Sequence, residues 1–266
     1  MVGEWRGVPI SGIAGDQQAA LFGQACFEPG MAKNTYGTGC FLLLHTGERI
    51  VASQNQLLST VAWQLDGRRE YCLEGSVFIA GALFQWLRDG LGLFKDIEEF
   101  NQLANSVPDS GGVVIVPALA GLGAPHWDPF VRGIITGLSR GTTKAHICRA
   151  AMEAVSFQVA ELRACMQRDA QRSIDELRVD GGACASDLLM QIQADLMDTH
   201  LIRPAVLETT AFGAAALAGL AVGFWESKEK LAETWRAEKE FIPNISPNES
   251  ELMHQQWQKA VKRVLL

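Results

Sequence analysis

The sequence predicts one α/β domain built over a mixed sheet, and three observations support this fold class. Near its beginning, two pairs of strand-forming runs are each separated by a glycine-containing turn, which is typical of antiparallel hairpins. From residue 112 onward, strand patterns alternate with helix patterns, which is typical of parallel pairing. The 266 residues are 48% apolar and 20% charged, the composition of a globular protein with a sizeable core. Antiparallel strands followed by parallel ones give a mixed sheet, without an obvious internal domain boundary.

The first part of the chain contains strong turn signals between its apolar runs. Gly15-Asp16 separates a short apolar run from a helix-favouring one, and the segment 37–39 and Asp66-Gly67 are turns of hairpin type. We therefore expect a strand at 9–13, a helix at 17–26, hairpin strands at 31–36 and 40–45, and hairpin strands at 57–65 and 69–73.

Helical spacing of apolar residues then becomes the main signal and alternates with short apolar strands. The tail contains two polar-faced helices joined by a stretch rich in Pro, Asn and Ser at 243–248. We expect helices at 77–91 and 97–107, strands at 112–116 and 133–137, a long helix at 144–168, a strand at 177–179, and helices at 186–197, 211–224, 227–236 and 249–264.

Charge and cysteine content argue against several classes of function. The net charge of −7 and the scattered Lys and Arg residues give no electrostatic footprint for nucleic acid. The six cysteines have no metal-ligand spacing, so we expect buried reduced thiols in a cytoplasmic protein. No secretory signal is recognisable at the start of the chain. The apolar segment 211–225 is shorter than the roughly 18 to 20 residues that span a bilayer, so we interpret it as a core helix.

Two glycine-rich turns at the ends of predicted strands are candidate binding sites. In Tyr-Gly-Thr-Gly-Cys at 36–40, the glycines let the backbone turn around an anion, and the Thr38 hydroxyl can donate a hydrogen bond to it. In Val-Asp-Gly-Gly-Ala at 179–183, paired glycines follow a buried strand, where open α/β sheets bind ligands. An ordinary hairpin turn and a tight strand-to-helix turn are the alternatives.

Two further features carry chemically useful groups. Asp16 stands at the start of an apolar helix, where a carboxylate can either cap the helix or accept a proton. The segment 122–129, Leu-Gly-Ala-Pro-His-Trp-Asp-Pro, is rigid and aromatic, and it is either structural or the lining of a cleft. Phosphate loops of the Walker type and the usual hydrolase, zinc-protease and protein-kinase motifs are missing from the sequence.

The order of these motifs resembles one protein family. Residues 10–23 read Ile-Ser-Gly-Ile-Ala-Gly-Asp-Gln-Gln-Ala-Ala-Leu-Phe-Gly, and residues 30–41 read Gly-Met-Ala-Lys-Asn-Thr-Tyr-Gly-Thr-Gly-Cys-Phe. The segments 73–78, 121–125, 133–153, 179–183 and 216–225 continue the pattern. Together they resemble the glycerol kinases of the FGGY carbohydrate kinase family over nearly the entire chain.

The resemblance implies a fold and a domain organisation. Such kinases have two actin-like ATPase lobes of the ribonuclease-H-like type, each with a mixed sheet and helices on both faces. The alcohol is held mainly by the N-terminal lobe and the nucleotide mainly by the C-terminal one. Residues 1–266 would then be a C-terminal nucleotide-binding domain without its N-terminal substrate domain.

The resemblance also implies roles on the alcohol side of the site. Asp16 would be the general base that takes the proton from the attacking glycerol hydroxyl, and it would also touch the substrate. Gln17 and Phe41 would contact glycerol.

On the nucleotide side, Thr38 would meet the phosphates, Gly81 and Gln85 the ribose and base side, and Gly182 the adenosine. The family has an asparagine where this chain has Ser186. The shorter side chain would lose a hydrogen bond to the nucleotide, so we expect weaker adenosine binding.

The activity implied is ATP-dependent phosphorylation of glycerol, with Mg²⁺ and ATP or ADP as cofactors and no metal ligands assigned in this chain. The expected partners are glycerol, ATP, the missing N-terminal lobe and a second copy of the chain, and the isolated lobe is expected to be inactive. Two alternatives stay open. One is another FGGY sugar kinase, acting on xylulose or gluconate, and the other is a non-catalytic fragment that binds nucleotide or another protein.

Overall fold

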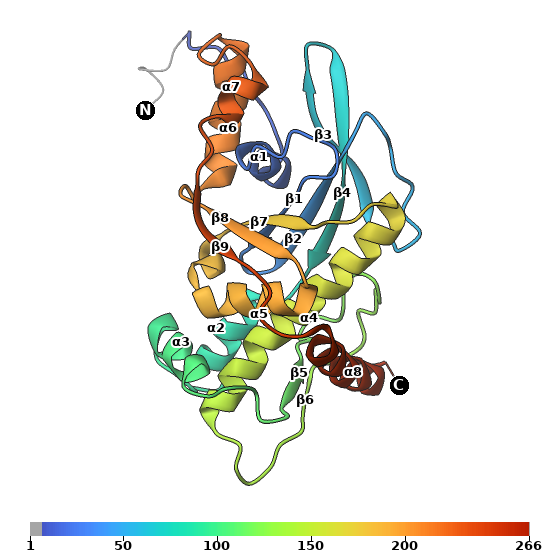
Figure 1. The fold of residues 1–266 in the computed structure, drawn as a ribbon, viewed down its shortest axis with the longest axis vertical. Coiled ribbons are helices and arrows are strands. Elements are labelled where there is room, and N and C mark those ends of the chain that lie inside the picture. Colours follow the sequence, from blue (N-terminus) through green and yellow to red (C-terminus); the bar gives the residue numbers. More distant parts are fainter. Residues whose placement is uncertain (1–6, 266) are drawn as a thin grey trace.

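The computed structural model describes residues 7–265, and a seven-stranded mixed sheet forms their centre (Figure 1). The strand order is β3-β4-β2-β1-β7-β8-β9. β1 pairs with β7 and β7 with β8 in parallel, whereas the other neighbours are antiparallel. This confirms the expected mixed sheet. The strands are β1 (Ala32–Tyr36), β2 (Cys40–Gly47), β3 (Leu58–Leu65), β4 (Arg68–Val77), β7 (Glu176–Asp180), β8 (His200–Pro204) and β9 (Ala237–Phe241).

Both predicted hairpins are confirmed. β1 and β2 pair around the turn at 37–39, with Tyr36 opposite Cys40. β3 and β4 pair around Asp66 and Gly67, whose φ values of 50° and 79° are those of a two-residue turn with left-handed residues. A second, two-stranded sheet of β5 (Val114–Val116) and β6 (Ile134–Thr136) lies below the main one (Figure 1).

Helices cover both faces of the main sheet (Figure 1), as expected. Alternate residues of β2 separate the two faces, because Leu43 packs into one hydrophobic cluster and Leu42 and Leu44 into the other. One face carries α1 (Asp16–Gly23), α6 (Thr209–Ala221) and α7 (Lys228–Ala232). The larger cluster on the other face includes residues of α2 (Gly81–Asp89), α3 (Ile97–Asn105), α4 (Lys144–Ala170), α5 (Asp187–Met197) and α8 (Pro247–Val264).

Three expectations about the elements are corrected by the structure. The segment 9–13 is irregular and not a strand, and it exposes Ile10 by 85% and Ile13 by 86%, because it joins no neighbouring strand. β8 was not expected, although it is buried beside β7. The helix predicted at 227–236 ends at Ala232, and β9 follows it as an edge strand with mostly exposed polar residues.

A very close helix crossing fixes α1 against α6. A Cβ atom on Gly213 would lie 1.8 Å from the backbone oxygen of Ala19, and one on Gly23 would lie 2.0 Å from that of Thr209. Only residues without a side chain allow this approach. The crossing holds α1 close against α6, and Asp16 is the first residue of α1.

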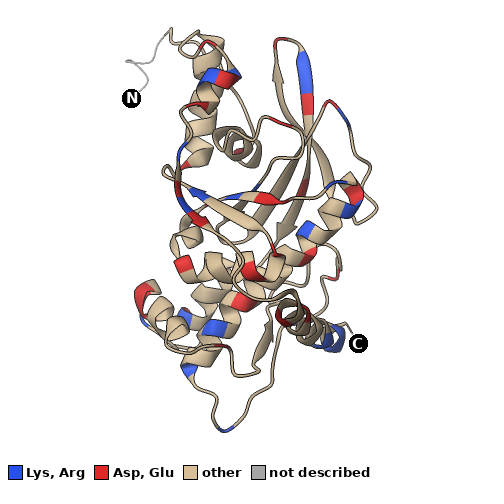
Figure 2. Cartoon of the chain, viewed as in Figure 1, with Lys and Arg blue, Asp and Glu red and all other residues tan. Residues whose placement is uncertain are grey.

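The six cysteines are buried free thiols, in agreement with the expectation. Burial raises the pKa of Cys26, Cys40 and Cys184 to about 12, so these thiols stay protonated at neutral pH. None of the helices within residues 7–265 is long and apolar enough to cross a membrane. Positive and negative side chains are intermixed over most elements (Figure 2).

Candidate functional site

The two glycine-rich turns of the sequence meet at one edge of the sheet. β1 and β7 are parallel neighbours, and Thr35 lies opposite Asp180. Their carboxyl ends are therefore adjacent, with the turn 37–39 after β1 and Gly181-Gly182 after β7. The 3₁₀ helix η1 (Gly182–Ala185) continues from the second turn into α5. Ligands of open α/β sheets bind at such a place.

Glycine is required in both turns because other parts of the backbone approach closely. Gly181 has a φ of +89°, and a Cβ atom there would lie 2.5 Å from the oxygen of Tyr36. A Cβ atom on Gly39 would lie 2.3 Å from the oxygen of Val77. The turns are thus held against each other and against the end of β4.

The turn after β1 is also tied to the start of α2. The backbone N–H groups of Ala80 and Ala82 donate to the oxygen of Thr38 at 2.9 and 3.0 Å, and that of Gly81 donates to the oxygen of Gly37 at 3.0 Å. These donors at the helix start are satisfied by the turn, so they are not free for a phosphate. The Thr38 side chain, in contrast, is exposed.

A cavity of about 270 Å³ opens between these elements, a little below the range of about 300 to 1,000 Å³ of small-molecule pockets. Four residues predicted to bind nucleotide line it: Thr38, Gly81, Gln85 and Gly182. A Cβ atom on Gly182 would meet no atom within 4 Å, so this glycine borders open space. The structure therefore brings together the four residues that the sequence had separated.

Sequence reasoning missed several other residues around this cavity. Arg88 lines it from α2 and pairs with Asp89, and Phe84 and Phe94 supply buried aromatic walls. The signal was available for α2, because positions 81, 84, 85 and 88 fall on one face of a helix. An apolar wall, a guanidinium and a hydroxyl suit a ligand with a flat ring and anionic groups.

Ser186 does not line the cavity. Its hydroxyl donates to Oδ1 of Asn101 at 2.8 Å and accepts from the backbone N–H of Leu189 at 3.4 Å, as the N-cap of α5. The hydroxyl is engaged within the protein. A direct contact with nucleotide stays a prediction for this residue.

Asp16 is the first residue of α1 and is exposed. Its Oδ1 accepts from the backbone N–H of Gln17 at 2.9 Å, and its Oδ2 accepts from Nε2 of Gln17 at 3.3 Å. The N-cap residue of the helix is Gly15, so Asp16 occupies one free N–H of the first turn without being the cap itself. The carboxylate remains accessible to a substrate hydroxyl.

Gln17, which contacts Asp16, and Phe41 share one neighbour. The ammonium of Lys33 donates to Oε1 of Gln17 at 2.5 Å and to the backbone oxygen of Phe41 at 3.4 Å. The three residues predicted to meet the alcohol are therefore connected through β1. Nothing in the sequence had pointed to Lys33.

The rigid segment 122–129 does not line this cavity and packs on the end of β4. Phe78 and Trp127 meet edge to face with ring centroids 5.9 Å apart, and His126 Nε2 lies 3.4 Å from a carboxylate oxygen of Glu161 on α4. These contacts favour the structural interpretation of this segment.

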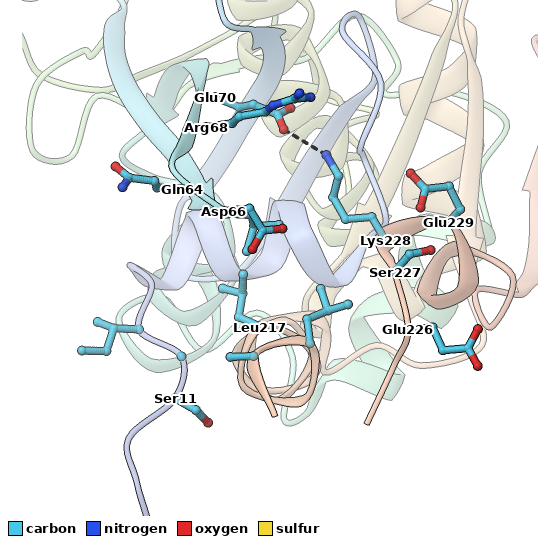
Figure 3. A pocket seen from close by; sticks show the side chains of 15 residues that line it. Ser11, Gln64, Asp66, Arg68, Glu70, Leu217, Glu226, Ser227, Lys228 and Glu229 are labelled. Atoms are coloured by element: carbon cyan, nitrogen blue, oxygen red, sulfur yellow. Dashed lines mark hydrogen bonds and ion pairs between the residues drawn. The ribbon is translucent and has the colours of Figure 1, made fainter. Parts of the chain in front are cut away.

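A larger hollow of about 780 Å³ lies between the segment 11–13, the β3–β4 turn and the end of α6 (Figure 3). Lys228 pairs there with Glu70 at 2.9 Å. Carboxylates outnumber cations around it, which is unfavourable for phosphates. Its charged residues are Asp66, Arg68, Glu70, Glu226, Lys228 and Glu229.

Comparisons with known proteins identify relatives of this chain. Residues 32–222 match the C-terminal domain of the FGGY family of carbohydrate kinases. The chain is 56% identical over 264 residues to a glycerol kinase of Dechloromonas aromatica, covering 98% of this chain and 53% of that one. It is 59% identical over 256 residues to a glycerol kinase of Deinococcus radiodurans, covering 96% and 51%. The chain thus spans about half the length of the curated relatives it matches.

Solved structures give the same result for the fold. A glycerol kinase of Plasmodium falciparum with ADP superposes with a TM-score of 0.88 at 36% identity, over 95% of this chain and 50% of that chain. A xylulose kinase of Lactobacillus acidophilus superposes with a TM-score of 0.79 at 21% identity, over 92% and 49%. The fold is therefore that of the actin-like ATPase domains of these kinases, as expected from the sequence.

Proposed function

Because the chain belongs to the FGGY family of carbohydrate kinases, we propose that it is the nucleotide-binding half of an ATP-dependent glycerol kinase. The reaction is the transfer of the γ-phosphoryl group of ATP to glycerol, which gives ADP and glycerol 3-phosphate. One observation carries the proposal: Thr38, Gly81, Gln85 and Gly182 line a single cavity where β1 and β7 end. The identity of 56 to 59% to glycerol kinases supports glycerol as the alcohol.

We assign the cavity to the adenine nucleotide. The base and ribose lie against Phe84, Gln85 and Gly182, and the phosphates extend toward the exposed hydroxyl of Thr38 and the guanidinium of Arg88. In phosphoryl transfer the protein mainly positions the reactants and balances charge, so a hydroxyl donor and a guanidinium are suitable groups.

Asp16 acts as the general base in this proposal. Its exposed carboxylate begins α1 beside Gln17, and the ammonium of Lys33 donates both to Gln17 and to the backbone oxygen of Phe41. It accepts the proton of the alcohol as that hydroxyl attacks phosphorus. Gln17 and Phe41 orient the alcohol next to it.

Mg²⁺ is part of the proposed reaction. Within residues 7–265 no three His, Cys, Asp or Glu side chains come together as a metal site. Mg²⁺ is usually held by one or two carboxylates together with substrate phosphates. The ion would therefore arrive on the nucleotide.

The partner that completes the site is the other half of the kinase. The segment 7–15 lies against α6, because the hydroxyl of Ser11 donates to the backbone oxygen of Ala218 at 3.3 Å. Ile10 and Ile13 on this segment and Phe224 after α6 are 85%, 86% and 75% exposed. Exposed apolar residues of this kind suit a protein interface. The free buried thiols suit a reducing compartment, and we place the kinase in the cytoplasm.

A coupled ADP-release assay tests the proposal. The purified chain is given Mg-ATP with and without glycerol, first alone and then with the N-terminal half of the Dechloromonas aromatica glycerol kinase. We expect turnover only with both halves and glycerol. Xylulose and gluconate serve as alternative substrates, and a preference for either would assign a different sugar kinase.

Inactivity of two halves that demonstrably associate would contradict the kinase proposal. It would favour the second candidate, a non-catalytic module that binds nucleotide or a protein partner. The half-length match to the relatives is the observation that keeps this candidate open.

A further inference from the structure

β1 contains a completely buried lysine. Lys33 has 0% exposure, and burial lowers its pKa, while the charges of Asp180 and Glu74 act in the opposite direction. Lysine is almost never fully buried unless its ammonium group is paired. The partners of this ammonium are therefore informative.

Neutral oxygen atoms surround the ammonium group. It donates to Oε1 of Gln17 at 2.5 Å, to Oγ1 of Thr35 at 2.7 Å and to the backbone oxygen of Phe41 at 3.4 Å. An ammonium has three donors and no acceptor. Each N–H of Lys33 thus has one acceptor, and the charges of Asp180 and Glu74 favour the protonated form.

This arrangement fixes the orientation of the Gln17 side chain. Because an ammonium can only donate, the amide oxygen of Gln17 has to face Lys33, and its NH₂ group has to point the other way. That NH₂ group lies 3.3 Å from Oδ2 of Asp16. If Lys33 were absent, the amide could turn over and present its oxygen to the carboxylate, which would repel it.

The same ammonium also reaches the nucleotide side of the site. The hydroxyl of Thr35 accepts from Lys33 and donates to Oδ1 of Asp180 at 2.5 Å. Oδ2 of Asp180 accepts from Gln24 at 2.7 Å and from Thr209 at 2.8 Å. Asp180 directly precedes the glycine pair at the cavity, so one buried network connects both ends of the reaction.

We propose that Lys33 is a positioning residue for phosphoryl transfer, which fixes the Gln17 amide and the Phe41 carbonyl so that the Asp16 carboxylate is held toward the alcohol. Lys33 does not touch the reactants in this proposal and acts through Gln17. The catalytic part of this inference rests on the proposed function. Its structural part, the orientation of Gln17, is independent of that function.

Hydrogen exchange of the Gln17 side-chain amide tests the structural part in this chain alone. The two NH₂ signals are assigned by their loss in Gln17→Leu and followed by NMR in wild type, in Lys33→Met and in Thr35→Val. Lys33→Met keeps the apolar stem and removes the ammonium. We expect exchange to accelerate about tenfold or more, since a hydrogen bond to a charged group is lost.

Thr35→Val is the matched control because it disturbs the same network and leaves the Lys33–Gln17 bond in place. Its Gln17 exchange is expected to stay within about twofold of wild type. Fast exchange already in the wild-type chain, or equal exchange in wild type and Lys33→Met, overturns the proposal. The wild-type measurement decides this even if Lys33→Met does not fold.

The catalytic part is tested with both halves assembled. Lys33→Met is expected to lower kcat by roughly 10- to 100-fold, since small misplacements at a reacting centre are costly, and to leave the KM for Mg-ATP unchanged. Thr35→Val is expected to keep more of the turnover than Lys33→Met. Equal loss in both variants would mean a structural role only. Inactive wild-type halves would instead contradict the proposed function, and the exchange data would still decide whether Lys33 holds Gln17.

Discussion

At the scale of single residues, the proposed phosphoryl transfer depends on the carboxylate of Asp16. Asp16→Asn removes the proton acceptor, keeps the size of the side chain, and leaves the nucleotide cavity untouched. Turnover of the assembled halves is expected to fall by roughly 10²- to 10⁴-fold, with the Kd of this chain for ADP unchanged. Steady-state kinetics and calorimetry measure the two effects.

The matched control for that experiment is Asp198→Asn at the C-cap of α5, at the opposite end of that helix from the nucleotide cavity. It is expected to keep wild-type turnover. If Asp16→Asn also keeps it, the base is another group.

Glu74 is a single residue that is expected to make the stability of the folded chain depend on pH. Burial raises its pKa above the ordinary 4.5, and Nε2 of Gln18 donates to its carboxylate at 3.1 Å. The folded state then binds the Glu74 proton more tightly than the unfolded state. Glu74 therefore contributes stability below pH 4.5, and this contribution is lost as the pH rises through the folded-state pKa.

Glu74→Gln mimics the protonated carboxyl group at every pH. We expect it to be nearly neutral at pH about 4 and to stabilise the chain relative to wild type at pH about 7. Urea unfolding at both pH values measures the difference. A variant whose stability differs from wild type equally at both would show that Glu74 does not titrate in this way.

Single residues also show how much of the candidate site could be predicted from the sequence. Thr38 and Gly182 lie in glycine-rich motifs, Gly81 and Gln85 were named from the family resemblance, and all four line one cavity. Lys33 was not named, because an isolated lysine in a strand is normally expected at the surface. Its burial depends on acceptors from α1 and β2 that only the folded chain brings to it.

The crossing of α1 and α6 is the most constrained contact at the scale of elements. Gly213→Ala places a methyl group 1.8 Å from the backbone oxygen of Ala19, and a backbone atom in a packed helix cannot move aside cheaply. We expect a loss of at least about 2 kcal/mol in the free energy of unfolding. Denaturant unfolding measures it.

Gly141→Ala is the matched control, because its new methyl group would meet only the Ser139 hydroxyl at an ordinary 3.7 Å. Its effect is expected to be within about 0.5 kcal/mol. Equal stability of the two variants would mean that the helices are less tightly crossed than described.

Elements with strong local signals were predicted well, and elements without them were not. The glycine turns identified both hairpins, and apolar periodicity identified α4 and α5. The edge strand β9 exposes nearly all of its polar side chains, so no alternation of apolar residues marks it. The segment 9–13 was predicted as a strand because it is apolar, but its isoleucines are exposed and no strand lies beside it.

At the scale of the whole molecule, the family resemblance implied helices on both faces, and the mixed sheet followed from the order of hairpins and alternating units. The strand order did not, because it depends on long-range pairing such as that between β1 and β7. The coverage of about half of each relative adds the expectation of a second half.

Ile13 tests that expectation. Ile13→Asp is expected to leave the stability of this chain unchanged, because the side chain is 86% exposed, and to weaken association with the N-terminal half at least about tenfold. Titration of one half with the other by calorimetry gives the Kd. Leu252→Asp on α8, an exposed apolar residue remote from α6 (Figure 1), is the control and is expected to associate normally. Equal Kd values for both variants would exclude the segment 7–15 from the interface.

The central claim is that adenine nucleotide binds where β1 and β7 end, and calorimetric titration of this chain with ADP tests it most directly. We predict binding at one site, weakened at least about tenfold by Gly182→Val with an unchanged melting temperature, because the new side chain enters open cavity space and meets no protein atom within 4 Å at its Cβ. Absence of binding, or the same Kd for wild type and Gly182→Val, would contradict the account.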